Sequence, residues 1–114
     1  MKEPMKYDIE LYRIKAELCK TLSDPKRQMM ISELRSGEKS VGDIAEAVGI
    51  AQPAASHHLA ILRERGVVEA RRDGASVYYS LTDDMIGVAC DLVHQVLLRQ
   101  LQRNRKMADK IAGS

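Results

Sequence analysis

Apolar residues in the middle of the chain recur at helical spacing on both sides of a glycine. The pattern predicts one helix over residues 40–48, with Ser40 placed to cap it, and a second helix over residues 52–66. Gly49 permits a left-handed turn between them, so the two helices can cross at a fixed angle. The apolar positions expected in this crossing are Ile44, Val48, Ile50, Ala55, Leu59 and Leu62. Residues 40–66 therefore predict a helix-turn-helix, which proteins use chiefly to place one helix in the DNA major groove.

Two further helices are predicted ahead of this pair. Residues 7–21 place charged side chains on one face and apolar side chains, with Cys19 among them, on the other. Asp24 is expected to cap the next helix, with Pro25 in its first turn, and that helix is expected to end near Ser36. Its expected apolar contributors are Met29, Met30, Ile31 and Leu34.

Two short runs with strand character follow the helix-turn-helix. Residues 67–72 and 76–81 flank the Asp-Gly pair at 73–74, which is a strong hairpin signal. Tyr78 and Tyr79 alternate along the second run, so one side chain is expected to pack inward and the other to face outward. These runs predict a β-hairpin.

The last predicted helix is apolar over more than one face. Thr82 is expected to be its N-cap, with Asp83 and Asp84 stabilising the positive end of the helix dipole. Its apolar residues cover an arc of roughly 220° around the helix. They are Met85, Ile86, Val88, Ala89, Leu92, Val93, Val96, Leu97 and Leu101. Because one packing face needs less than this arc, we expect the helix to pack both on its own domain and on a second copy of the chain.

The composition fits one small domain with an aliphatic core, extending over residues 1–114. The chain has no Phe or Trp, and its formal net charge is only +2. A nucleic-acid surface would therefore depend on uneven placement of charge rather than on a general excess of cations. The two cysteines and the lack of a signal-peptide pattern predict a reducing, cytoplasmic location. No apolar run approaches the roughly 18 residues of a membrane span, so no membrane partner is expected.

Several blocks of the sequence together resemble the ArsR/SmtB repressors. They are Leu-Ser-Asp-Pro-Lys-Arg at 22–27, Ser-Val-Gly-Asp-Ile-Ala at 40–45, Ser-His-His-Leu at 56–59, Leu-Arg at 62–63, Gly-Val-Val at 66–68 and Arg-Arg-Asp-Gly-Ala-Ser-Val-Tyr-Tyr-Ser-Leu at 71–81. The resemblance implies a mainly helical fold with a small β-hairpin, the winged helix-turn-helix, with its elements in the order ααααββα. It also implies that helices at 7–22 and 83–108 form a dimer interface and that residues 67–81 form the wing.

The resemblance further implies a function. Members of this family are homodimeric DNA-binding repressors that usually release DNA when a metal, a metalloid or a thiol oxidant binds. We therefore expect a sequence-specific repressor whose partners are double-stranded operator DNA and a second copy of the chain, with no required cofactor. The alternatives are a winged helix without a metal site that binds DNA constitutively or non-specifically, and a module that binds proteins instead. The chain has no nucleophile–base–acid set and no phosphate-binding loop, so we do not expect an enzyme.

The candidate DNA contacts begin on the second helix of the helix-turn-helix. Its first turns present Gln52, Ala54, Ser56 and His57. Gln pairs well with adenine, and Ser or His can donate to a base edge or a phosphate. For His57 a surface position without a DNA role is the alternative, whereas His58 is expected to face inward as a structural residue. The family usually has Ser where this chain has Ala51 and Pro53, so two hydroxyl donors are missing.

Arginines near the wing are further candidates for phosphate contact. Arg71 and Arg72 precede the hairpin tip, and the resemblance favours Arg72 over Arg71. Arg63, on the recognition helix, is a third candidate. A plain solvated surface is the alternative interpretation for all three side chains.

Candidate sensory residues are few. The family's Cys-x-Cys thiolate site before the turn is absent, because residues 41–43 read Val-Gly-Asp. Its zinc or nickel site on paired last helices needs Asp-x-His and a later His pair, whereas Asp91 and His94 are isolated and cannot close a tetrahedral site. Cys19, Cys90 and His94 form a third candidate set. Thiolates suit a metal or metalloid ion such as arsenite, copper(I), cadmium or zinc, and two close thiols suit a redox switch. Plain packing of both cysteines is the alternative.

Overall fold

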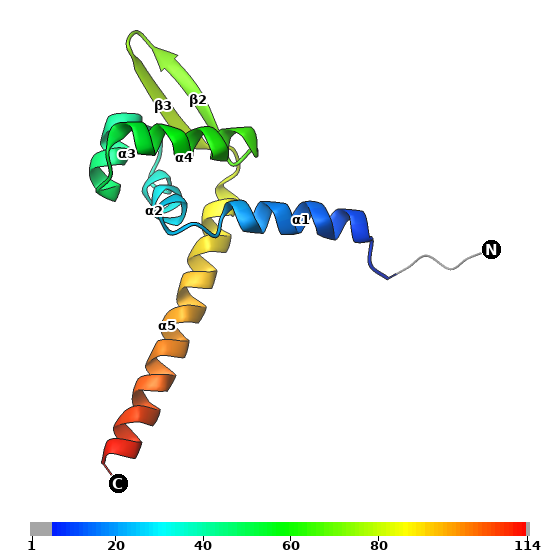
Figure 1. Ribbon diagram of the computed structural model, residues 1–114, viewed down its shortest axis with the longest axis vertical. Helices are drawn as coiled ribbons and strands as arrows, with labels where there is room; N and C mark the ends of the chain where they lie inside the picture. The colour runs from blue at the N-terminus through cyan, green and yellow to red at the C-terminus, as the bar shows by residue number, and fades with distance from the viewer. Residues whose placement is uncertain (1–5, 114) are drawn as a thin grey trace, which may run out of the picture.

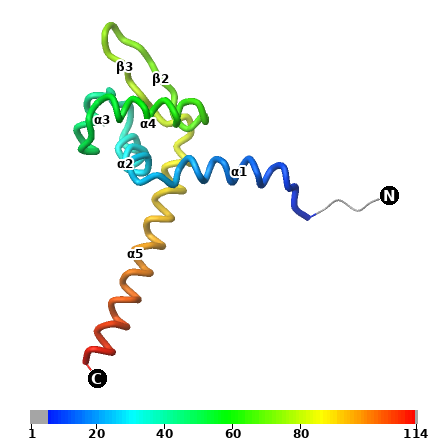
Figure 2. Tube along the Cα trace, viewed as in Figure 1, coloured from blue at the N-terminus to red at the C-terminus, as the bar shows by residue number. Residues whose placement is uncertain are grey.

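The computed structural model describes residues 6–113, whose elements divide into a head and two arms (Figures 1 and 2). In chain order the elements are α1 (Ile9–Thr21), α2 (Pro25–Leu34), β1 (Lys39–Ser40), α3 (Val41–Val48), α4 (Gln52–Glu64), β2 (Val68–Asp73), β3 (Ser76–Leu81) and α5 (Asp84–Ala112). The head contains α2, α3, α4 and the hairpin, whereas α1 and most of α5 extend from it in different directions (Figure 1). The predicted winged helix-turn-helix, mainly helical with a small β-hairpin, is confirmed.

The head has a closed aliphatic core. Its buried members are Met30, Ile31, Leu34, Ile44, Ala45, Val48, Ala55, Leu59, Leu62, Val67 and Val68. They come from α2, α3, α4 and the start of the hairpin, because each helix turns one apolar face inward. Met29 was expected to join them, but its side chain is 43% exposed, since Met30 and Ile31 occupy the inward face of α2. The core fixes the crossing of α3 and α4.

The turn between α3 and α4 depends on Gly49. This residue has φ 77° and ψ 38°, in the left-handed region that favours glycine. The backbone N–H groups of Gly49 and Ile50 both donate to the carbonyl oxygen of Ala45, at 2.9 and 3.1 Å. The glycine therefore ends α3 and aims the chain into α4.

Side-chain caps set where most helices begin. Asp24 and Ser40 cap α2 and α3, as predicted. Asp8 caps α1, so this helix begins at Ile9 rather than at residue 7. The prediction that Thr82 caps α5 is wrong, because the carboxylate of Asp83 accepts a hydrogen bond from the N–H of Met85 at 2.9 Å.

Thr82 instead ties the end of the wing to its start. Its hydroxyl donates to the carbonyl oxygens of Gly66 and Val67, at 2.6 and 3.1 Å. The following helix, α5, continues to Ala112, beyond the predicted end at residue 108. No helix within residues 6–113 combines the length and apolar character that crossing a membrane requires.

The wing, formed by β2 and β3, belongs to a small three-stranded antiparallel sheet. β3 lies between β1 and β2, with Asp73 opposite Ser76 at the hairpin turn. β1 was not predicted, because two residues are too few to show an alternating pattern. It pairs Lys39 with Tyr79 and so joins the wing to the segment that precedes α3.

Candidate nucleic-acid interface

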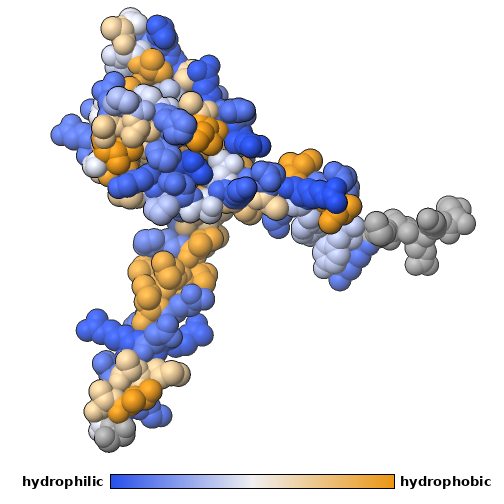
Figure 3. All heavy atoms as spheres, in the orientation of Figure 1, coloured by the Kyte–Doolittle hydropathy of each residue, from blue (hydrophilic) through white to orange (hydrophobic). Residues whose placement is uncertain are grey.

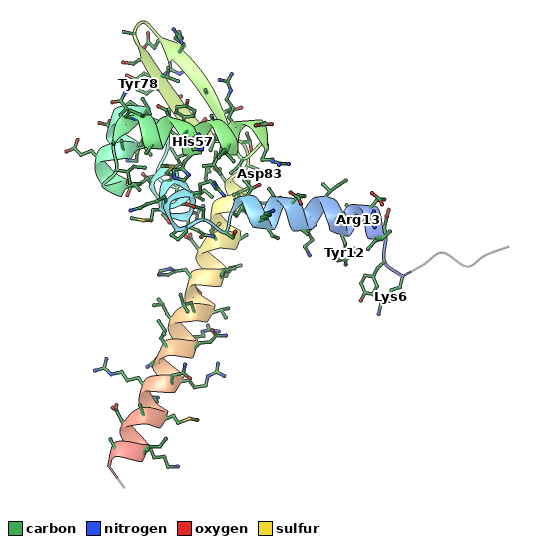
Figure 4. The ribbon with its side chains drawn as sticks, viewed as in Figure 1. Lys6, Tyr12, Arg13, His57, Tyr78 and Asp83 are labelled. Carbon is green, nitrogen blue, oxygen red and sulfur yellow. The ribbon has the colours of Figure 1, made fainter. Side chains whose placement is uncertain are left out.

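The recognition helix α4 is held in the head by one face and exposes another. Ala55, Leu59 and Leu62 are its buried residues. The side chains predicted to contact DNA, Gln52, Ala54, Ser56 and His57, are all exposed. Figure 4 shows His57 on α4, with Tyr78 on the neighbouring wing. A helix that is fixed on a rigid core and exposes a row of polar side chains has the geometry needed to contact base edges in a DNA groove.

A concave surface joins the start of α4 to the wing. Gln52 and Ser56 line a groove of about 430 Å³ together with residues of the α3 start and the wing, Ser40, Val41, Gly42, Ala75, Ser76 and Val77. A Cβ atom on Gly42 would lie 3.8 Å from the Oε1 atom of Gln52, an ordinary van der Waals distance, so the two residues are neighbours at this groove. Hydroxyl and amide groups therefore converge beside the first turn of the recognition helix.

His58 differs from its neighbour, as predicted. Its side chain is half-buried, and its Nδ1 atom is buried without a hydrogen-bond partner in the described part of the chain. The backbone N–H of Arg27 is the main reason that the pKa of Asp24 is lowered, and the charge of nearby His58 contributes to the same shift. His58 therefore faces the start of α2 rather than solvent.

Arg71 is engaged within the head. Its Nη2 and Nε atoms lie 2.7 and 3.1 Å from the two carboxylate oxygens of Glu38, and its guanidinium lies 4.9 Å from the centre of the Tyr78 ring. The hydrogen bond from Arg71 lowers the pKa of Glu38, and Glu38 in turn raises the pKa of Arg71. Arg71 thus fastens the wing to the segment between α2 and α3, which makes it a weaker candidate for phosphate contact than the sequence alone indicated.

Arg72 and Arg63 have the opposite character. They line one groove of about 370 Å³, together with Ala70, Val77 and Tyr79. Neither guanidinium forms an ion pair with any other residue in 6–113. Tyr79 packs against the core, as expected for one of the two tyrosines, whereas Tyr78 is half-buried beside Arg71 rather than fully outward-facing. The groove between the wing and the end of α4 therefore holds two cations that form no ion pair among residues 6–113, Arg72 from the wing and Arg63 from α4.

Both arms expose apolar side chains. Figure 3 shows an apolar patch along α5 and smaller ones on α1. The exposed apolar residues of the arms are Ile9, Leu11, Tyr12, Ile14, Leu18, Met85, Val88, Leu92, Val93, Val96, Leu97, Leu98, Leu101, Met107 and Ile111. An apolar surface of this extent is typical of a protein–protein interface.

The three candidate sensory residues do not meet within one chain. Cys90 and His94 line a groove of about 310 Å³ between α2 and α5, and burial raises the pKa of the Cys90 thiol. Cys19 is exposed on α1 and does not line this groove. Asp91 forms an ion pair with Arg35 at 2.8 Å. Residues 6–113 contain no group of three His, Cys, Asp or Glu side chains that fits a metal ion.

A helix-turn-helix seated on an aliphatic core, a β-hairpin beside it and a long terminal helix define a winged helix-turn-helix protein. The family model described as "Bacterial regulatory protein, arsR family" matches residues 24–70. The HTH-type transcriptional regulator Rv0081 of Mycobacterium tuberculosis is 38% identical over 92 residues, which cover 80% of this chain and 81% of that protein. The chain belongs to the arsR family of bacterial regulatory proteins, so the prediction that it is not an enzyme is confirmed.

Other relatives agree with this assignment. The biofilm growth-associated repressor of Xylella fastidiosa is 47% identical over 68 residues, and the match spans only 60% of the length of either protein. The solution structure of the homodimeric winged helix-turn-helix DNA-binding domain Mb0332 from Mycobacterium bovis is 30% identical, with a TM-score of 0.77 over 90% of this chain and 95% of that one. The crystal structure of Rv0081 is 36% identical, with a TM-score of 0.74 over 90% and 98%.

Proposed function

We propose that the chain is a homodimeric, sequence-specific DNA-binding transcriptional repressor that acts in the cytoplasm. One observation carries this proposal: the exposed polar row of α4 stands on a fully buried core beside the two unpaired arginines, Arg63 and Arg72. Phosphate contacts from such cations position a protein on DNA, and side chains in the groove select the sequence. The relative in Xylella fastidiosa is named as a repressor, which supports the direction of the effect.

The apolar arms support the homodimer. Exposed apolar residues on α1 and in the apolar arc of α5 would be covered if the same surface of a second copy packed against them. The Mycobacterium bovis relative is described as homodimeric. A symmetric pair would place two recognition helices on half-sites about 34–36 Å apart.

A binding titration tests the proposal. The purified protein is titrated against duplexes from its own promoter and against scrambled duplexes of the same length, at several salt concentrations, while light scattering gives its mass. A dimer that prefers one promoter sequence by about a thousandfold or more supports the proposal. A monomer with equal, salt-sensitive affinity for every duplex overturns it and identifies a non-specific binder. A protein that binds no duplex is instead a protein-interaction module.

Replacing Arg72 by Ala is expected to weaken binding to all sequences alike. Removal of one phosphate contact should lower the slope of log affinity against log salt by about 1. The matched control is Arg105→Ala, which removes a cation from the far end of α5. An Arg72→Ala slope equal to that of the control would remove Arg72 from the phosphate contacts.

We further propose that Cys19, Cys90 and His94 receive the signal that releases DNA. Cys90 and His94 share a groove, and Cys19 lies on an exposed face that a dimer would bring toward another α5. Residues 6–113 of one chain bring no three His, Cys, Asp or Glu side chains together for a metal ion, so we expect the ligands of a metal or metalloid ion to come from two subunits. The raised pKa of Cys90 keeps its thiol protonated at neutral pH, which slows its reaction with oxidants. Cys19 is therefore the thiol expected to react first.

Replacing Cys19 or Cys90 by Ser is expected to preserve operator binding and abolish its loss on treatment with arsenite or polysulfide. The measurement is the operator affinity before and after treatment, with reductant added afterwards to show reversal. Oxidation of Cys90 in the Cys19→Ser variant should accelerate as the pH rises, because its raised pKa leaves little thiolate at neutral pH. An undiminished response in both variants would assign the cysteines to packing.

A further inference from the structure

One arginine of the head lies across the long terminal helix. Arg35, the C-cap residue of α2, places its Nε and Nη2 atoms 3.0 and 2.8 Å from the Oδ2 atom of Asp91. Its Nη1 atom lies 3.4 Å from the carbonyl oxygen of Asp84. A single guanidinium thus spans the first turns of α5, from its start to Asp91.

A glycine makes this crossing possible. Gly87 is the buried residue of α5, and a Cβ atom on it would lie 2.0 Å from the Cδ atom and 2.8 Å from the Nε atom of Arg35. Its φ lies outside the left-handed region, so the backbone itself does not require glycine. A glycine inside a helix costs about 1 kcal/mol relative to alanine. Glycine at this position lets the Arg35 side chain pass close to the helix, where a Cβ atom would collide with it.

The crossing joins two parts of the molecule with different tasks. α2 contributes Met30 and Ile31 to the core on which the recognition helix stands. α5 leaves the head after its first turns and carries the apolar arm (Figures 1 and 3). Only Ile86 and Cys90 of α5 pack against the core. The polar contacts of Arg35 therefore add to the packing of Ile86 and Cys90 in setting the direction of α5 relative to the head.

We propose that Arg35, Gly87 and Asp91 form a latch that sets the distance between the two recognition helices of the dimer. The inference rests on the proposed dimeric DNA-binding function and makes these three positioning residues for operator recognition. The side chains of Arg35 and Asp91 are 33% and 47% exposed, so their ion pair adds little to the stability of the fold. Its contribution is geometric: a shifted α5 moves one head relative to the other, and the operator then no longer fits both.

The test compares a full operator with an isolated half-site. The variants are Gly87→Ala, which places a methyl group where Arg35 passes, and Asp91→Asn, which removes the charge with little change in shape. Asp109→Asn on the same helix is the matched control. Each protein is titrated against the half-site, the full operator and operators whose half-sites are moved by one or two base pairs, and its mass and thermal midpoint are measured.

Both latch variants are expected to remain dimeric and to bind the half-site as the wild type does. They should lose about 5- to 150-fold in affinity for the full operator, the range typical of coupling between two sites. Their preference for one spacing should broaden or move, and Asp91→Glu should restore part of it.

Unchanged full-site affinity and spacing preference would overturn the latch. An equal loss on half-site and full site would also overturn it, because that pattern reports a damaged head. If Gly87→Ala does not fold, Asp91→Asn decides alone. If the wild type prefers no operator at all, the proposed function fails, and the latch fails with it.

Discussion

Replacing Val96 by Glu is expected to separate the dimer and abolish operator binding. The side chain of Val96 is 52% exposed in the single chain and lies near the middle of the apolar arc of α5. Burying one such side chain contributes about 1.5–3 kcal/mol, and a symmetric interface contains each substitution twice. A loss of about 3–6 kcal/mol would raise the dimer dissociation constant by about 10²–10⁴, before the cost of desolvating two carboxylates.

Operator affinity should fall when the dimer dissociates, because a single subunit lacks the increase in affinity, about 10²–10⁴, that a linked second binding site provides. Sedimentation or light scattering gives the mass, and a titration gives the operator affinity. Gln102→Glu is the control, since it adds the same charge to α5 on the side away from the arc. A dimeric Val96→Glu protein with wild-type affinity would show that α5 is not the interface.

Most of the fold could be predicted from local features of the sequence. The helix-turn-helix was predictable because Gly49 and the buried positions of α3 and α4 follow from helical periodicity and turn chemistry. The exposed row of α4 followed from the same periodicity. Thr82 and Asp83 are adjacent and either could cap α5, and the sequence alone led to the wrong prediction of Thr82. Asp83 is the cap because the carbonyl groups of Gly66 and Val67, distant in the sequence, engage Thr82.

Contacts between distant residues limited the prediction of the site. The resemblance favoured Arg72 over Arg71, but the physical reason appears only in the fold. The fold brings Glu38 to Arg71 and leaves Arg72 without an ion-pair partner among residues 6–113. The latch was missed for the same reason, since Arg35 and Asp91 are 56 residues apart. One local signal did exist: Gly87 lies inside a long helix without ending it. Such a glycine often marks the close approach of another group.

Replacing Leu59 by Ala is expected to cost the largest share of the folding free energy of any change considered in the head. Leu59 is fully buried, with 0% exposure, and lies in the core with Met30, Ile44 and Leu62. A Leu→Ala change at such a site costs about 2–5 kcal/mol, because apolar contacts are lost and a cavity remains. Domains of this kind are stable by only about 5–15 kcal/mol in total, so the change removes a large share of the free energy that holds the recognition helix in place.

Urea denaturation at one fixed protomer concentration measures this loss, since dimer stability depends on concentration. Leu98→Ala is the matched control: the same atoms are removed from a side chain that is 52% exposed on α5, outside the main apolar arc. Its effect should stay within about 0.5 kcal/mol. The midpoint of Leu59→Ala should therefore fall well below that of Leu98→Ala, with a similar slope. Equal midpoints would mean that α4 is not anchored through Leu59. Other residues would then have to hold the recognition helix in place for sequence-specific binding.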